Sequence, residues 1–167
     1  MALATLWRPA LQFWPPPKKG SWQDHIFRLL FRALVYCGLV ASALWLWQSG
    51  WPGGIVPIMG AVLVVLGFGG AFGSTSELGW KNAFGDNKGL ITSGLFRFSR
   101  NPIYVMTWVG LLGWGLVVQA PLVWTMLGMW ALIYVIVTRL EEPWLHRQYG
   151  AAYAAYCAKT PRFLLIK

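Results

Sequence analysis

Residues 101–138 read NPIYVMTWVGLLGWGLVVQAPLVWTMLGMWALIYVIVT and contain no charged side chain. A helix needs about 20 apolar residues to cross about 30 Å of hydrocarbon, because each residue adds about 1.5 Å. The run is long enough for two spans, and Gln119-Ala120-Pro121 marks the break between them. We expect transmembrane helices at about 102–118 and 121–138, joined as a tight antiparallel hairpin.

A second charge-free run extends from Ala33 to Ser76, with a glycine- and proline-rich break at residues 50–54. It predicts two more spans, at about 26–48 and 55–72. Small residues at a helix surface let a neighbouring helix approach closely, which we favour over a chemical role for the glycines of the second span. These glycines are Gly60, Gly67, Gly69 and Gly70.

Residues 1–24 combine tryptophans, lysines and the run Pro15-Pro16-Pro17. The prolines forbid a continuous helix, and the pattern of a cleaved signal peptide is missing. We interpret this segment as an interfacial arm, and whether it carries a short fifth membrane-embedded element stays open. The predicted fold class is an all-α integral membrane protein with four or five transmembrane helices in a single domain over residues 1–167.

The composition supports this fold class. Hydrophobic residues make up 57% of the chain, charged residues only 11%, and 12 residues are Trp, which favours bilayer interfaces. The net charge of +9 fits anionic lipid headgroups better than nucleic acid, because the basic residues flank apolar runs. Cys37 and Cys157 lack the spacing of metal ligands, and His146 lacks a second ligand nearby, so no metal site is expected.

The distribution of charge predicts the orientation. With four spans, the links at 49–54 and 119–121 carry no charge, so every Lys, Arg, Asp and Glu falls on one side of the membrane. The positive-inside rule identifies that side as the cytoplasm, with both termini there. Localisation in the inner, cytoplasmic membrane follows as an expectation.

Two segments on that side contain the candidate site: a loop at 74–101 and a helix with its tail at 139–167. The hairpin returns its ends to one surface, so Arg100 and Asn101 should lie near Arg139, Glu141 and Glu142. Carboxylates suit an ammonium or sulfonium centre, and arginines suit a carboxylate or phosphate. These charges therefore favour a site for a zwitterionic ligand.

The segment after residue 138 is expected to form a separate helix. Pro143 suits the first turn of a helix, where Glu142 would act as its cap. Side chains at spacings of three and four then share one face, and an interfacial helix with aromatic anchors is the preferred interpretation of its tyrosines. The side chains on this face are Glu142, His146, Tyr149, Tyr153 and Tyr156.

Two motifs carry a family resemblance. The first runs from Gly89 to Tyr104 as GLxTxGLFRxxRNPxY, and the second begins at Glu141 as EExxLxxxYGxxYxxY and ends in PRF at 161–163. In this order they resemble the motifs of isoprenylcysteine carboxyl methyltransferases and related phospholipid methyltransferases. The resemblance covers roughly residues 80–163.

The resemblance implies S-adenosylmethionine as cofactor, bound on the cytoplasmic side beside a membrane-accessible cavity. Glu141 resembles the acid that engages the cofactor's amino group, and Lys81 is a further, weaker match. The positions that resemble the cofactor-contacting segment are Lys88, Gly89, Leu90, Ile91, Phe96, Asn101, Pro102 and Tyr104. Asn101 replaces the family's histidine, and an amide cannot accept a proton.

The resemblance also implies where the methyl acceptor binds. The family's substrate-facing arginine lies four residues before the glutamate, which is Val137 here, and Arg139 is the candidate substitute. Together with Arg100 and Glu142, Arg139 completes the expected catalytic set. A lipidic or small membrane-partitioned acceptor, with a carboxylate, thiol or amine, is the expected substrate.

The leading hypothesis is therefore an integral-membrane S-adenosylmethionine-dependent methyltransferase. An NADPH-dependent membrane reductase of similar architecture and a non-catalytic membrane scaffold are the alternatives. Membrane lipids are the expected surroundings, and nucleic acid is not an expected partner.

Overall fold

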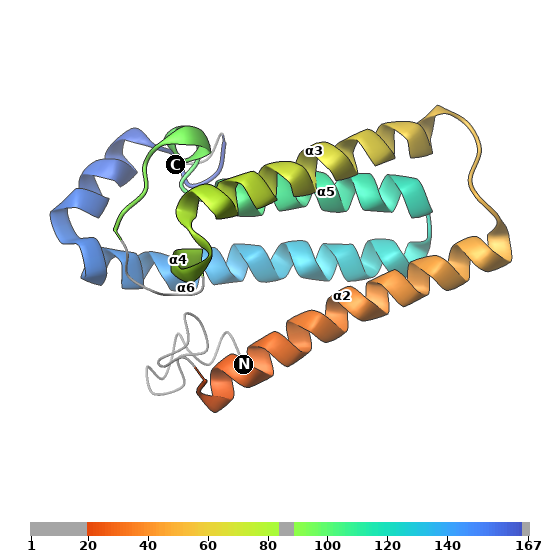
Figure 1. The fold of residues 1–167 in the computed structure, drawn as a ribbon, viewed down its shortest axis with the longest axis horizontal. Coiled ribbons are helices and arrows are strands. Elements are labelled where there is room, and N and C mark those ends of the chain that lie inside the picture. The colour runs from red at the N-terminus through yellow and green to blue at the C-terminus, as the bar shows by residue number, and fades with distance from the viewer. Residues whose placement is uncertain (1–19, 84–88, 165–167) are drawn as a thin grey trace.

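The computed structural model describes residues 20–83 and 89–164, and among them it contains helices and no strand. The expected arm at 1–19 and the predicted cofactor contact Lys88 lie outside the described residues. Figure 1 shows an elongated bundle in which the long helices lie alongside one another. The helices are α2 (Trp22–Ser49), α3 (Ile55–Leu78), α4 (Trp80–Ala83), α5 (Pro102–Val118) and α6 (Pro121–Lys159), with a 3₁₀ turn η2 (Gly94–Arg97).

Three of these helices, α2, α3 and α6, are long and apolar enough to cross a membrane. The fourth, α5, has 17 residues, which at about 1.5 Å per residue gives about 25 Å. The helices end at the predicted breaks, at residues 50–54 and 119–120. α3 continues to Leu78 rather than ending near Phe72. In this last part the hydroxyls of Ser74 and Thr75 are satisfied within the helix, because they donate to the carbonyls of Gly70 and Ala71.

A seam of glycines joins α3 to α5. A Cβ on Gly60 would lie 2.7 Å from the carbonyl oxygen of Gly113, and a Cβ on Gly67 would collide with the backbone of Gly110. Gly70 faces the side chain of Met106. The predicted close packing is confirmed at Gly60, Gly67 and Gly70. It is wrong for Gly69, where no atom lies within 4 Å of an added Cβ.

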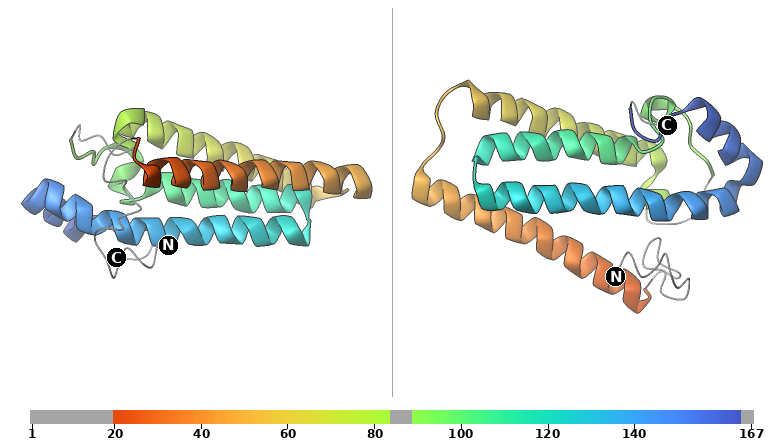
Figure 2. Two further views of the ribbon diagram at one scale, coloured as in Figure 1. Left: turned by 90° about the horizontal axis from the view of Figure 1, so that it is seen from below. Right: turned by 180° about the vertical axis from the view of Figure 1, so that it is seen from behind.

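α2 packs more loosely and diverges from the bundle towards its N-terminal end (Figures 1 and 2). It begins after Ser21, whose hydroxyl accepts from the amide of Asp24 at 3.4 Å. Its contacts with the bundle include an aromatic pair and a hydrogen bond. Phe31 meets Trp130 edge to face at 5.2 Å between ring centroids, and Ser42 accepts from the indole nitrogen of Trp114 at 3.0 Å.

α6 does not begin a new helix at Pro143, so the expected cap at Glu142 is wrong. Proline lacks one amide hydrogen, and α6 tolerates the loss of that single bond and continues through it. The break comes instead at Gly150, whose φ of 51° and ψ of −127° interrupt the helical backbone. The segment 151–159 then turns back over the end of the bundle (Figure 1).

Candidate functional site

A cavity of about 500 Å³ lies where the charged ends of the helices meet. Its walls come from α2, the end of α3, the loop at 89–91, the start of α5 and the second half of α6. A volume of this size is typical of small-molecule sites. The sequence-predicted residues that line it are Gly89, Leu90, Ile91, Phe96, Arg100, Asn101, Pro102, Tyr104 and Glu141.

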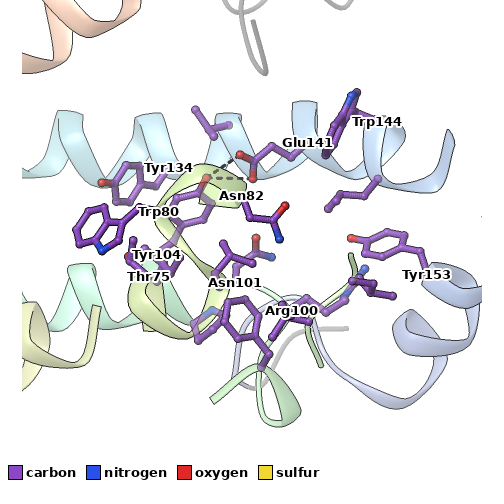
Figure 3. A pocket seen from close by; sticks show the side chains of 18 of the residues that line it. Thr75, Trp80, Asn82, Arg100, Asn101, Tyr104, Tyr134, Glu141, Trp144 and Tyr153 are labelled. Carbon is purple, nitrogen blue, oxygen red and sulfur yellow. Dashed lines mark hydrogen bonds between the residues drawn. The ribbon is translucent and has the colours of Figure 1, made fainter. Parts of the chain in front are cut away.

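Glu141 and Tyr104 join the two motifs across the cavity (Figure 3). The hydroxyl of Tyr104 donates to both carboxylate oxygens of Glu141, at 2.9 and 3.0 Å. The ring of Tyr104 packs on that of Tyr134 with centroids 4.5 Å apart, which helps to fix the position of the donor. A carboxylate oriented in this way at a cavity wall suits a cationic ligand group.

Arg100 lines the same cavity with a side chain that is only 8% exposed. Its Nη1 contacts an oxygen of Glu142 at 3.1 Å and donates to the sulfur of Cys157 at 2.8 Å. Its Nε is buried and has no hydrogen-bond partner among the described residues. A buried donor without a partner is costly, so this nitrogen is suited to an anionic ligand atom.

Glu142 acts on the cavity through Arg100, because it does not line the cavity itself. Its carboxylate also accepts from Nε and Nη2 of Arg162, at 2.8 and 2.6 Å. These contacts raise the pKa of Arg162. Glu142 therefore clamps the start of the hairpin to the C-terminal segment.

The C-terminal segment at 160–164 holds residues 99–101 by its backbone. The carbonyl of Pro161 accepts from the amide of Arg100 at 2.9 Å, and the carbonyl of Arg162 accepts from the side-chain amide of Asn101 at 3.0 Å. The hydroxyl of Ser99 donates to the same carbonyl of Arg162 at 3.2 Å. Asn101, at the position of the family's histidine, is thus a structural tie.

The tyrosines after the break at Gly150 are buried rather than anchored in the interface. Tyr153 is 2% exposed and Tyr156 is 8% exposed, so the interfacial interpretation is wrong for both. The hydroxyl of Tyr156 donates to the carbonyl of Phe96 at 2.6 Å, and burial raises the pKa of Tyr156 to about 12. This side chain therefore stays a neutral donor that fixes η2. His146 is exposed and meets the ring of Tyr153.

Glycines shape the loop before η2. Gly89 and Gly94 adopt φ values of 111° and 52°, which favour glycine. A Cβ at Gly94 would collide with the carboxylate of Glu77, which accepts from the hydroxyl of Ser93 at 2.7 Å. The spacing of Gly85, Gly89 and Gly94 in the sequence predicts such a role for the backbone; the structure confirms it at Gly89 and Gly94, and Gly85 lies outside the described residues.

Arg139 does not reach the cavity. It is exposed, and it precedes Glu141 by two residues, which turns it by about 200° around a helix of 3.6 residues per turn. Val137, one turn before Glu141, does line the cavity. The described part of the chain also brings together no group of three or more metal-ligating side chains. The backbone of Lys81 lies in α4.

The sequence reasoning missed the wall formed by α2. Phe27, Arg28, Phe31 and Arg32 line the cavity. The available signal was the spacing of Asp24, Arg28 and Arg32, which places them on one face of a helix. It also missed aromatic and amide side chains on the other walls, which are Trp80, Asn82, Tyr134 and Trp144.

Comparisons with known proteins support the two motifs. The sequence model of a family described as phospholipid methyltransferase matches residues 55–152. The cobalt-zinc-cadmium resistance protein CzcN of Cupriavidus metallidurans is 35% identical over 78 residues, which is 46% of this chain and 36% of CzcN. The chain thus matches about a third of the length of that relative. No solved structure matches it.

Proposed function

We propose that this chain, which belongs to the phospholipid methyltransferase family, is a membrane methyltransferase that transfers a methyl group from S-adenosylmethionine to a membrane-partitioned acceptor. The acceptor carries a carboxylate, thiol or amine at its polar end. The observation that carries the proposal is the contact between Tyr104 and Glu141, which joins the two motifs at the wall of a ligand-sized cavity. The family match favours neither a reductase nor a scaffold.

The residues of the cavity fit this cofactor. Glu141 would pair with the cofactor's ammonium group, and the guanidinium of Arg100, whose Nε has no partner among the described residues, would hold its carboxylate. Trp80 and Trp144 offer aromatic surfaces to the adenine ring. The loop backbone from Gly89 to Ile91, with Phe96, Asn101 and Pro102, borders the cofactor. Lys81 and Lys88 stay predicted contacts from the motif alone.

The protein's contribution to the chemistry is orientation and exclusion of water. When bound, the cofactor supplies an electrophilic methyl group on a sulfonium centre. Methyl displacement needs an in-line approach, so residues that fix both reactants matter more than a base. A carboxylate or thiolate acceptor is already ionised, whereas an amine would transfer its proton to Glu141 or to water. Glu142 is a positioning residue here, because it holds Arg100.

The cavity belongs on the cytoplasmic side in this proposal. It lies at the end of the bundle opposite the charge-free links at 50–54 and 119–120, which Figure 1 shows together at the other end. The positive-inside rule then directs the cavity and both termini to the cytoplasm. All four long helices span the membrane, α5 as the shortest, within a single domain.

Titration of the purified protein with S-adenosylhomocysteine, followed by calorimetry, tests the proposal. We expect the wild type to bind it and Glu141→Gln to bind about tenfold or more weakly, because the ammonium loses its charged partner. Unchanged affinity would remove Glu141 from the site. Parallel titration with NADPH is the control: binding of NADPH alone would indicate a reductase, and binding of neither a scaffold.

A further inference from the structure

The N-terminal half of α2 presents a mixed wall to the cavity. Phe27, Arg28, Phe31 and Arg32 all line it, and their spacing of one and four residues places them on one stripe of the helix. Phe31 is held there by Trp130 at 5.2 Å and by Tyr134 at 6.4 Å between ring centroids. Two aromatic rings beside two guanidinium groups suit an amphiphile with an anionic end.

Among the described residues, two of the three arginines that line the cavity pair with a carboxylate. Arg28 pairs with Asp24 at 2.6 Å, and Arg100 pairs with Glu142 at 3.1 Å. The side chains of α6 that line the cavity include no Lys or Arg, and Glu141 is assigned to the cofactor's ammonium group. Arg32 forms no hydrogen bond or ion pair within residues 20–83 and 89–164, although it lines the cavity. Its positive charge is therefore available to a ligand.

α2 lies outside the part of the chain that the family model matches. The match covers residues 55–152. Arg100, within the match, already offers a buried donor to the cofactor.

We propose that Arg32 binds the anionic group of the methyl acceptor, a carboxylate or a phosphate, while Phe27 and Phe31 pack against its apolar part. This inference rests on the proposed function, since it assigns the acceptor's side of the same cavity. A charge-assisted contact next to apolar walls is stronger than one in open water, so a single arginine suffices to select anionic amphiphiles. Both arginines are exposed, but Arg32 lines the cavity and Arg139 does not, so Arg32 takes the role that the sequence assigned to Arg139.

The test measures binding of three amphiphiles with the same chain: dodecanoate, dodecyl phosphate and dodecanol. The full-length protein is placed in nanodiscs of zwitterionic phosphatidylcholine, with and without saturating S-adenosylhomocysteine, and titrated in a calorimeter. We expect the wild type to bind at least one anionic probe about tenfold more tightly than dodecanol. The stronger of the two anionic probes distinguishes a carboxylate from a phosphate acceptor.

The variants locate the effect at one side chain. Arg32→Gln should lower the affinity for the anionic probe about tenfold and leave dodecanol unchanged, and Arg32→Lys should restore part of the loss. Arg147→Gln is the matched control, because Arg147 is an exposed arginine of α6 that does not line the cavity. It should bind all three probes like the wild type.

Several results would overturn the inference. The first is that the wild type binds the anionic and the neutral probes with equal affinity. The second is that Arg32→Gln binds the anionic probe as tightly as the wild type. The third is that Arg147→Gln loses as much affinity for the anionic probe as Arg32→Gln does. A loss in Arg139→Gln without one in Arg32→Gln would return the role to Arg139. Weaker S-adenosylhomocysteine binding in Arg32→Gln would move Arg32 to the cofactor. Failure of the wild type to bind S-adenosylhomocysteine would instead count against the proposed function, and the amphiphile affinities would still be measured.

Discussion

α2 and α3 are both long apolar helices, yet they pack in opposite ways. α3 contains several glycines and meets α5 backbone to backbone along a seam at Gly60 and Gly67. α2 contains one glycine, Gly38, which faces the ring of Trp114, and its other contacts are made by side chains. Apolar character alone therefore places a helix in the membrane, and small residues decide how closely it approaches a neighbour.

The two kinds of packing form different walls of the cavity. The seam between α3 and α5 fixes the ends of two helices that carry Thr75 and Tyr104 at the cavity. α2 diverges where it lines the cavity, so its N-terminal half forms a wall that depends on few contacts (Figure 1). The wall formed by α3 and α5 is therefore closely packed, whereas the wall formed by α2 is held by side-chain contacts.

The largest effect is expected from Gly67→Val, which breaks the seam. The new side chain would collide with the backbone of Gly110, and backbone cannot rotate away. We expect a loss of about 4 kcal/mol or more of unfolding free energy, or no folded protein, measured by thermal unfolding in detergent. Gly69→Val is the control and should stay within about 0.5 kcal/mol of the wild type, since nothing lies within 4 Å of that position. Equal losses would mean that the seam is not what holds α3.

A smaller effect is expected from Phe31→Ala, which loosens α2. The change removes the ring contacts to Trp130 and Tyr134, and because Phe31 is half-buried we expect a cost of about 2 kcal/mol. Leu30→Ala on the same helix should cost little, because Leu30 is 58% exposed. Chemical denaturation measures both variants. Similar costs would show that α2 is held by general apolar burial rather than by this contact.

The smallest effect is expected from Ser42→Ala, which removes one polar tie of α2. The indole nitrogen of Trp114 loses its acceptor, which should cost about 1 kcal/mol in the same denaturation assay. Thr125→Val provides a comparison, because the hydroxyl of Thr125 donates only to the carbonyl of Pro121 in its own helix. If Thr125→Val lowers the free energy of unfolding by as much as Ser42→Ala, the hydrogen bond between Trp114 and Ser42 does not stabilise the packing of α2.

Much of the fold was predictable because membrane spans are marked by absence of charge. The links at 50–54 and 119–120 fall where glycine and proline interrupt the apolar runs, and these predictions are confirmed. The bend of α6 was not predictable from local signals, since Pro143 is the stronger helix breaker in isolation. The bend occurs at Gly150, because glycine has no side chain and adopts a positive φ without a steric clash.

The candidate site was predictable to the extent that its residues lie in motifs. The two motifs and the hairpin together indicate that Arg100 and Glu142 should be neighbours, and their 3.1 Å contact confirms it. The prediction for Arg139 was based only on its distance from Glu141 in the sequence. Two residues along a helix correspond to a rotation of about 200°, so the two side chains point in different directions. Arg28 and Arg32 were missed because only tertiary structure brings α2 to the cavity.

The backbone ties between residues 99–101 and 161–162 have a consequence for biosynthesis. They join segments some 60 residues apart, so the chain must be synthesised at least to Arg162 before the start of the hairpin is held in place. The helices that are long and apolar enough to cross a membrane, α2, α3 and α6, can enter a bilayer earlier, as each is completed. Insertion and the acquisition of a working cavity are therefore separate events, and a nascent chain that is already in the membrane has no finished site to fill.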